Sequence, residues 1–188
     1  PDGLIQIVIG EREVGEVITK SRDVAIVSAT GSTRMGHAVS VAVAERFGKS
    51  ILELGGNNAM IVAPSADLEM ALRAIVFSAV GTAGQRCTSL RRLIVHESVY
   101  DDVLAKLITA YKQVEKKIGD PTDPKNLMGP LNSRDAVDAY LDSIAKAKAS
   151  GGKVETGGAA IEGKGNFVLP TIVTGLTNDA EIVQHETF

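Results

Sequence analysis

The chain has 188 residues and a net charge of −3, and 44% of its residues are hydrophobic but only 4% aromatic. This length suits one large domain or two small ones, and a core of aliphatic side chains is common in α/β proteins. Acidic and basic residues are interspersed without a basic stripe, which argues against a nucleic-acid partner. No apolar run approaches the roughly 18 residues that span a bilayer, and the first residues lack the pattern of a secretory signal.

Cys87 is the only cysteine, so an internal disulfide is excluded and a reducing, cytoplasmic location is expected. A lone cysteine is by default a small buried hydrophobic residue rather than a reactive group. The residues around Cys87 must therefore indicate whether it is a structural residue or a reactive thiol.

Strand and helix signals alternate in the first part of the chain. Strands are predicted at 4–9, 24–29 and 50–54, with helices at 11–21 and 37–47. Strands joined by crossover helices predict a parallel sheet and hence an α/β fold.

A second unit is predicted to begin after the Gly55-Gly56 pair. Its strands are expected at 59–63, 93–95 and 168–173, and its helices at 67–80, 101–118 and 133–149. Asp67 is a suitable cap for the first of these helices, whose apolar residues from Leu68 to Val80 recur at helical spacing.

The segment Gly31-Ser32-Thr33-Arg34-Met35-Gly36 lies between a predicted strand and a predicted helix. Backbone N–H groups at a helix start can bind phosphate, and Gly31 has no Cβ to obstruct a ligand. The spacing is not the G-x-G-x-x-G fingerprint, so an ordinary tight turn remains the alternative.

Glu53 ends a predicted buried strand, directly before Leu54-Gly55-Gly56. Ligand crevices of α/β proteins lie at the carboxyl ends of parallel strands. Partial burial there would make the carboxylate a better proton acceptor and a candidate general base. A solvent-facing or ion-paired glutamate is the equally supported alternative.

Cys87 belongs to the segment 81–88, where an apolar helix is predicted to break into a glycine-containing loop. Structural cysteines more often lie inside regular elements. Arg86 precedes Cys87, and its charge would favour the thiolate if the two side chains are close. This setting favours a reactive cysteine.

Together these segments resemble the aldehyde dehydrogenase superfamily, which is marked by a Gly-Ser-Thr turn, a Glu-Leu-Gly-Gly strand end and a Gly-Gln-x-Cys loop. All three occur here in the family order, and Glu186-Thr187-Phe188 resembles the start of the family's Glu-x-Phe-Gly-Pro motif. The segments 55–59 and 81–91 are most similar to the α-aminoadipic semialdehyde dehydrogenase (antiquitin) branch. Asn57 departs from the many relatives that have lysine after the paired glycines.

The resemblance implies a parallel Rossmann-type sheet followed by a three-layer α/β catalytic domain. Residues 1–55 would be the C-terminal half of the NAD(P)-binding domain, and residues 56–188 a catalytic domain truncated at its C-terminal side. The chain starts at Pro1 without methionine, and we expect it to be an internal part of a longer enzyme with little activity alone. The intact enzyme is expected to be a homo-oligomer, a dimer or a tetramer.

The resemblance also implies a mechanism of aldehyde oxidation to the carboxylic acid. Cys87 would attack the aldehyde carbonyl, its backbone N–H would help hold the oxyanion, and Glu53 would activate water to hydrolyse the thioester. Relatives that pass the acyl group to coenzyme A generally lack this glutamate, so its presence favours hydrolysis. Arg86 and Thr88 are the expected substrate-binding residues, Arg86 as the partner of a substrate carboxylate.

The expected cofactor is NAD, with NADP not excluded, and no metal is expected. The cofactor-binding residues that the resemblance implies are Gly31, Ser32, Gly36, Leu54, Glu186 and Phe188. Of these, Ser32 would contact the pyrophosphate, Glu186 the nicotinamide ribose, and Phe188 the ring. Two alternatives stay open: another aldehyde, such as betaine aldehyde or succinate semialdehyde, and a catalytically silent binding module.

Overall fold

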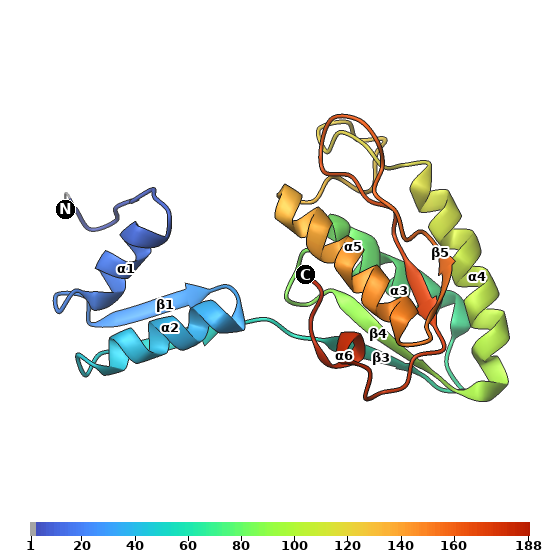
Figure 1. Ribbon diagram of the computed structural model, residues 1–188, viewed down its shortest axis with the longest axis horizontal. Helices are drawn as coiled ribbons and strands as arrows, with labels where there is room; N and C mark the ends of the chain where they lie inside the picture. Colours follow the sequence, from blue (N-terminus) through green and yellow to red (C-terminus); the bar gives the residue numbers. More distant parts are fainter. Residues whose placement is uncertain (1–2) are drawn as a thin grey trace. The chain divides into compact units, whose positions relative to one another are not determined.

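The computed structural model describes residues 3–188, which form two compact units that divide between Gly55 and Gly56 (Figure 1). The first unit contains α1 (Arg12–Lys20), β1 (Ile26–Thr30), α2 (Thr33–Ala44) and β2 (Lys49–Glu53). The two strands pair in parallel from Ile26↔Lys49 to Thr30↔Glu53. The predicted parallel β–α–β crossover is therefore confirmed in this unit.

The strand predicted at residues 4–9 is wrong. This segment has no regular secondary structure, and Ile5 and Ile9 are 89% and 92% exposed. The sheet of the first unit has only two strands, so the segment has no partner for its backbone N–H and C=O groups within residues 3–188. An apolar run alone does not distinguish a buried strand from an extended segment of this kind.

The second unit, Gly56–Phe188, holds the larger part of the structure. Its elements are β3 (Asn58–Val62), α3 (Leu68–Val80), the short helical turn η1 (Gly81–Gly84), β4 (Leu90–Val95), α4 (Glu97–Glu115), α5 (Arg134–Ala149), β5 (Lys153–Thr156), β6 (Ile172–Thr174) and α6 (Glu181–Gln184). β3 and β4 pair in parallel across the α3 crossover, and β5 and β6 form an antiparallel pair. The α/β class predicted from the sequence is confirmed.

Local sequence explains the principal boundaries of the second unit. The Asp67 side chain caps α3 by accepting hydrogen bonds from the Glu69 and Met70 N–H groups, as predicted. The predicted strand 168–173 is shortened to β6, since Pro170 has no N–H to donate to a partner strand. The sequence did not predict β5 or α6, which are both four residues long.

The core of the second unit consists of two apolar clusters. One is built around α4 and α5 (Val80, Tyr111, Val114, Met128, Leu131, Val137 and Val168), and the other joins the β3–β4 sheet to α3 and α4 (Val62, Ile75, Leu90, Val103 and Leu107). Val80 and Leu90 flank the cysteine-containing segment, so the core anchors this segment at both ends. Within the described residues, no helix combines the length and the apolarity needed to cross a membrane.

Candidate active site

The first unit places the Gly31 turn and Glu53 at one edge of its sheet. Thr30 and Glu53 are paired at the carboxyl ends of β1 and β2, and the Gly31 N–H donates to the Glu53 carbonyl oxygen at 3.0 Å. Because parallel strands end at the same edge, the predicted phosphate-binding turn and the predicted base are neighbours.

Ser32 is the N-cap of α2, and its hydroxyl oxygen accepts a hydrogen bond from the Met35 N–H at 3.1 Å. The first turn of α2 has no acidic residue, so the positive end of the helix dipole is not neutralised by a side chain. Such a helix start suits a bound anion.

Gly36 and Leu54 pack against each other behind this turn. A Cβ on Gly36 would lie 2.5 Å from Leu54 Cδ2, well inside van der Waals contact. Glycine therefore allows α2 to approach the segment that follows β2, which keeps the Ser32 end of the helix beside Glu53.

Glu53 is exposed in the first unit, so the partial burial expected from its strand is not observed. The reason is that β2 is an edge strand paired with β1 alone, with residues Ile51 and Glu53 on an open face. Its position at the strand end, rather than burial, is what suits it to act on a ligand.

The second unit presents Cys87 on a tight turn between η1 and β4. The Ser89 N–H donates to the Arg86 carbonyl oxygen at 3.0 Å, and the Arg86 N–H donates to the Ser89 hydroxyl at 3.2 Å. Ser89 is buried whereas Cys87 is exposed, so Ser89 anchors the turn in the protein interior and the Cys87 thiol is accessible. Just before it, Thr82 and Ala83 adopt left-handed φ values of 55° and 52°, a strained geometry for a β-branched residue.

Two amide side chains hold this turn from outside. Asn58 Nδ2, at the start of β3, donates to the carbonyl oxygens of Cys87 at 2.6 Å and Ser89 at 3.0 Å. Gln85 accepts a hydrogen bond from the Asn132 N–H at 2.8 Å and donates to the Pro130 carbonyl oxygen at 3.2 Å. The sequence interpretation missed both roles, although Asn58 and Gln85 lie within the segments that carry the family resemblance.

Arg91 was also missed, and it joins the cysteine-containing turn to the chain segment 186–188. Its guanidinium forms an ion pair with Glu186 at 3.2 Å and lies 5.5 Å from the centre of the Phe188 ring. Burial lowers the pKa of Arg91 from its usual value, and the Glu186 carboxylate opposes that shift. The structure thus brings the predicted ribose-binding glutamate and the predicted nucleophile loop together around one largely buried cation.

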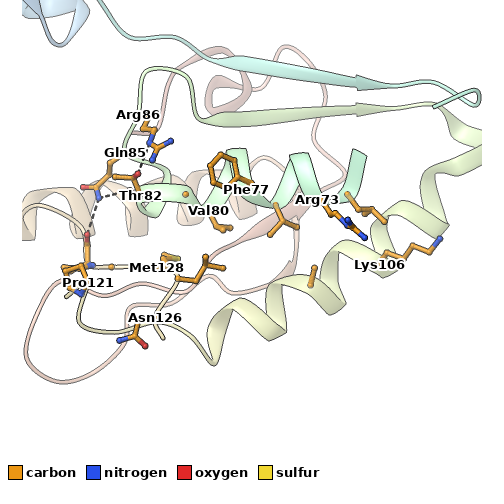
Figure 2. Close-up of a pocket in the computed structure, with 17 residues that line it drawn as sticks. Arg73, Phe77, Val80, Thr82, Gln85, Arg86, Lys106, Pro121, Asn126 and Met128 are labelled. Atoms are coloured by element: carbon orange, nitrogen blue, oxygen red, sulfur yellow. Dashed lines mark hydrogen bonds between the residues drawn. The ribbon is translucent and has the colours of Figure 1, made fainter. Parts of the chain in front are cut away.

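A cleft of about 930 Å³ opens beside the loop, lined by α3, α4 and the segment 121–130 (Figure 2). Arg86 lies at one end, where its Nε donates to the Thr82 hydroxyl at 2.8 Å, and Phe77 and Val80 form an apolar middle. Arg86 and Thr88 are both exposed, which leaves them accessible to a substrate.

The site residues thus fall into two sets. The first unit carries Gly31, Ser32, Gly36, Glu53 and Leu54, whereas the second carries Arg86, Cys87, Thr88, Glu186 and Phe188. Each set is held together within its own unit.

The chain is similar in sequence to a group of curated enzymes. It is 55% identical over 185 residues to a putative aldehyde dehydrogenase family 7 member A1 homolog of Caenorhabditis elegans. The matched region covers 98% of this chain and 35% of that relative. It is 46% identical to the α-aminoadipic semialdehyde dehydrogenase of Mus musculus over 100% of this chain and 34% of that enzyme. The chain therefore spans about a third of the length of these relatives.

Solved structures show the same relationship. A succinate-semialdehyde dehydrogenase from Burkholderia pseudomallei superposes with a TM-score of 0.93 at 36% identity, covering 100% of this chain and 39% of that one. A betaine aldehyde dehydrogenase from Staphylococcus aureus in complex with NAD+ superposes with a TM-score of 0.88 at 30% identity, covering 92% and 35%. The aldehyde dehydrogenase family matches residues 1–188. On these grounds the chain belongs to the aldehyde dehydrogenase family.

Proposed function

We propose that the protein oxidises an aldehyde to a carboxylic acid through a thioester on Cys87, with NAD as the hydride acceptor. The observation that carries the proposal is the exposed Cys87 on a turn held by Asn58 and Arg91, in a chain of this family. A thiol displayed on a fixed backbone suits a nucleophile better than a residue of the core.

The first step is attack by the Cys87 thiolate on the aldehyde carbon, which turns the carbonyl oxygen into an oxyanion. The Cys87 backbone N–H is the proposed donor to that oxygen. The fixed turn keeps the sulfur and this N–H on one rigid piece of backbone. Bound NAD would accept the hydride of the aldehyde carbon, and Cys87 would then hold the acyl group as a thioester.

Glu53 is the proposed base of the second step. Its carboxylate takes a proton from water, the resulting hydroxide attacks the thioester carbon, and the Cys87 thiolate leaves with its electron pair. The products are the carboxylic acid and the regenerated nucleophile.

The residues present fit a dinucleotide. The α2 start, capped by Ser32 and without acidic residues in its first turn, suits the pyrophosphate. The Glu186 carboxylate, 21% exposed, suits the ribose hydroxyls, and the Phe188 ring is 55% exposed and available for packing. Bound NAD would supply the hydride acceptor. Gly31 precedes Ser32 in the turn proposed for the pyrophosphate, and Gly36 lets α2 pack closely on Leu54 behind that turn.

The proposed substrate is an amino-acid semialdehyde of the α-aminoadipic type. Arg86 is exposed at one end of the cleft, and its Nε donates to the Thr82 hydroxyl, which leaves its two terminal nitrogens as donors for a substrate carboxylate. Betaine aldehyde carries a positive charge, which Arg86 would repel. Succinate semialdehyde, which has a carboxylate, remains the closest competitor.

We also propose that the first unit belongs to an NAD-binding domain and the second to a catalytic domain, in a cytoplasmic homo-oligomer. Apolar side chains such as Phe47 and Ile51 are 99% and 56% exposed, which favours burial against further protein surface. Sedimentation of the intact protein tests the oligomer, and a single monomeric species would contradict it.

The activity is tested by NADH formation from α-aminoadipic semialdehyde, succinate semialdehyde and betaine aldehyde in the intact protein. We expect turnover in that order, and a loss of roughly a thousandfold or more in Cys87→Ala. Cys87→Ser keeps the shape of the side chain and separates loss of the thiol from loss of packing. Substantial oxidation by both variants would rule out Cys87 as the nucleophile.

A further inference from the structure

Arg91 lies on β4, and none of the chemical steps above uses it. Its Nη2 donates to the carbonyl oxygens of Gly84 at 3.2 Å and Arg86 at 3.1 Å, on either side of Gln85 in the cysteine-containing loop. Its Nη1 donates to the Thr187 carbonyl oxygen at 2.6 Å. One guanidinium therefore bonds two segments that are far apart in the sequence.

The second segment carries the proposed ribose ligand. The same Nη2 lies 3.2 Å from Glu186 Oε1, which leaves the other carboxylate oxygen of Glu186 available to a ligand. The guanidinium of arginine presents its donors on separate nitrogens in a fixed planar fork, whereas lysine has three donors on one nitrogen at the end of a flexible chain.

Stability alone does not account for this arrangement. The Arg91 side chain is 11% exposed, and its Nε is buried without a partner among residues 3–188. Burying an incompletely bonded cation opposes folding, and a buried ion pair contributes little net stability compared with apolar residues of the same size. The bonds of Arg91 are better explained by what they hold in place.

We propose that Arg91 is a positioning residue that fixes the cysteine-containing loop and the Glu186 carboxylate as one body. Ribose binding at Glu186 and the orientation of Cys87 are then coupled through a single side chain. The coupling rests on the proposed function, because Glu186 is assigned to the ribose there.

The test compares Arg91→Lys with Arg92→Lys in the intact protein. Arg92 is the next residue of the same strand, but its Nε donates to the Asn57 carbonyl oxygen at 2.8 Å, away from the loop and from Glu186. We expect Arg91→Lys to raise KM for NAD about tenfold and to change the alkylation rate of Cys87 about fivefold, as loss of charged hydrogen bonds predicts. Arg92→Lys should leave both quantities within about twofold.

A double-mutant cycle measures the coupling itself. Glu186→Gln should alter KM for NAD less in the Arg91→Lys background than in the wild type. If Arg91→Lys does not fold, Glu186→Gln alone still decides, because coupling requires it to change the alkylation rate of Cys87 without NAD present. An unchanged rate overturns the proposal.

The two proposals fail separately. If the wild type oxidises aldehydes but Arg91→Lys matches Arg92→Lys in KM and in alkylation, the positioning role is overturned and the proposed function stands. If no aldehyde supports NAD reduction, the proposed function falls. The alkylation measurements then still support or overturn the link between Arg91, Glu186 and the cysteine-containing loop.

Discussion

Each unit of the chain contains a parallel β–α–β crossover, but the two present their candidate site residues in different ways. In the first unit a backbone bond and a local cap suffice: the Gly31 N–H donates to the Glu53 carbonyl oxygen, and the Ser32 hydroxyl caps its own helix. In the second unit, side chains distant in sequence hold the site, chiefly Asn58 and Arg91 on the turn that carries Cys87.

The hydrophobic core of the first unit is also smaller than that of the second. The buried hydrophobic residues of the first unit are Val27 and Val43, whereas two clusters of such residues fill the second. A turn fixed by its own backbone needs little support, but a turn with left-handed residues needs a packed frame around it. The comparison predicts that substitutions in the second unit affect Cys87 through the distant side chains that hold its turn, such as Asn58 and Arg91. Substitutions in the first unit should affect only their immediate neighbours.

The largest effect expected from a change in the first unit is that of Glu53→Gln. The amide side chain would preserve the shape of the strand end but could not accept the proton from water, so we expect steady turnover to fall about a hundredfold or more. The initial burst of NADH should persist, because the first step does not need the base. Rapid-mixing absorbance measures both phases.

The control for this variant is Glu45→Gln, an exposed glutamate at the end of α2 in the same unit. It should leave burst and turnover unchanged. Unchanged steady turnover in Glu53→Gln would instead remove Glu53 from the mechanism.

The next largest effect concerns Asn58, which holds the turn that carries Cys87. Asn58→Asp would place a carboxylate oxygen against the carbonyl oxygens of Cys87 and Ser89, in place of a donor. We expect it to destabilise the second unit by about 1–3 kcal/mol and to change the alkylation rate of Cys87. Thermal unfolding and alkylation kinetics measure the two effects.

Asn57→Asp is the matched control, because the Asn57 amide donates to the Val183 carbonyl oxygen at 2.6 Å, in α6 rather than in the turn. It should reduce stability to a similar degree without altering alkylation. Equal alkylation rates in the two variants would show that the turn does not depend on Asn58.

How much the sequence could predict follows from the same contrast. The Ser32 turn and the Asp67 cap depend on residues close in sequence, and they were predicted. The parallel strand pairs were predicted from the alternation of strand and helix signals along the chain. Cys87 was singled out because its glycine-containing context is also local. The structure places Cys87 exposed on a turn, and its reactivity stays a prediction.

What the sequence missed depends on distant contacts. No local pattern indicates that Arg91 bonds Thr187 or that Asn57 bonds Val183, since each pair closes only when the chain folds. The strand predicted at 4–9 failed for the converse reason, because its apolar pattern was right but it has no pairing strand among the described residues. The burial expected for Glu53 failed likewise, since it required a third strand or a covering layer.

Gly36→Ala tests whether the first unit really acts locally. The added Cβ would meet Leu54 at 2.5 Å, and we expect overpacking to destabilise this unit by about 1–3 kcal/mol and to weaken NAD binding. The helical glycine Gly15 of α1 has nothing within 4 Å of its Cβ position. Gly15→Ala should therefore be neutral or stabilising by up to about 1 kcal/mol. Equal effects on the two melting curves would contradict close packing at Gly36.

The smallest effect concerns the deeper core of the second unit. Burial raises the pKa of Tyr111 from 10.0 to about 12. In the unfolded chain this hydroxyl ionises near pH 10, while in the folded unit it keeps its proton, so the unfolded state binds fewer protons between these values. The free energy of unfolding must then fall as pH rises from 10 to about 12. Tyr111→Phe should flatten this fall without abolishing it, because burial also raises the pKa of Tyr140.

The 3 tyrosines of the chain, Tyr100, Tyr111 and Tyr140, all lie in the second unit, so tyrosine absorbance follows that unit alone. If the fall in stability were as steep in Tyr111→Phe as in the wild type, the hydroxyl would have to ionise inside the folded core, and the frame around Cys87 would be looser than its packing indicates.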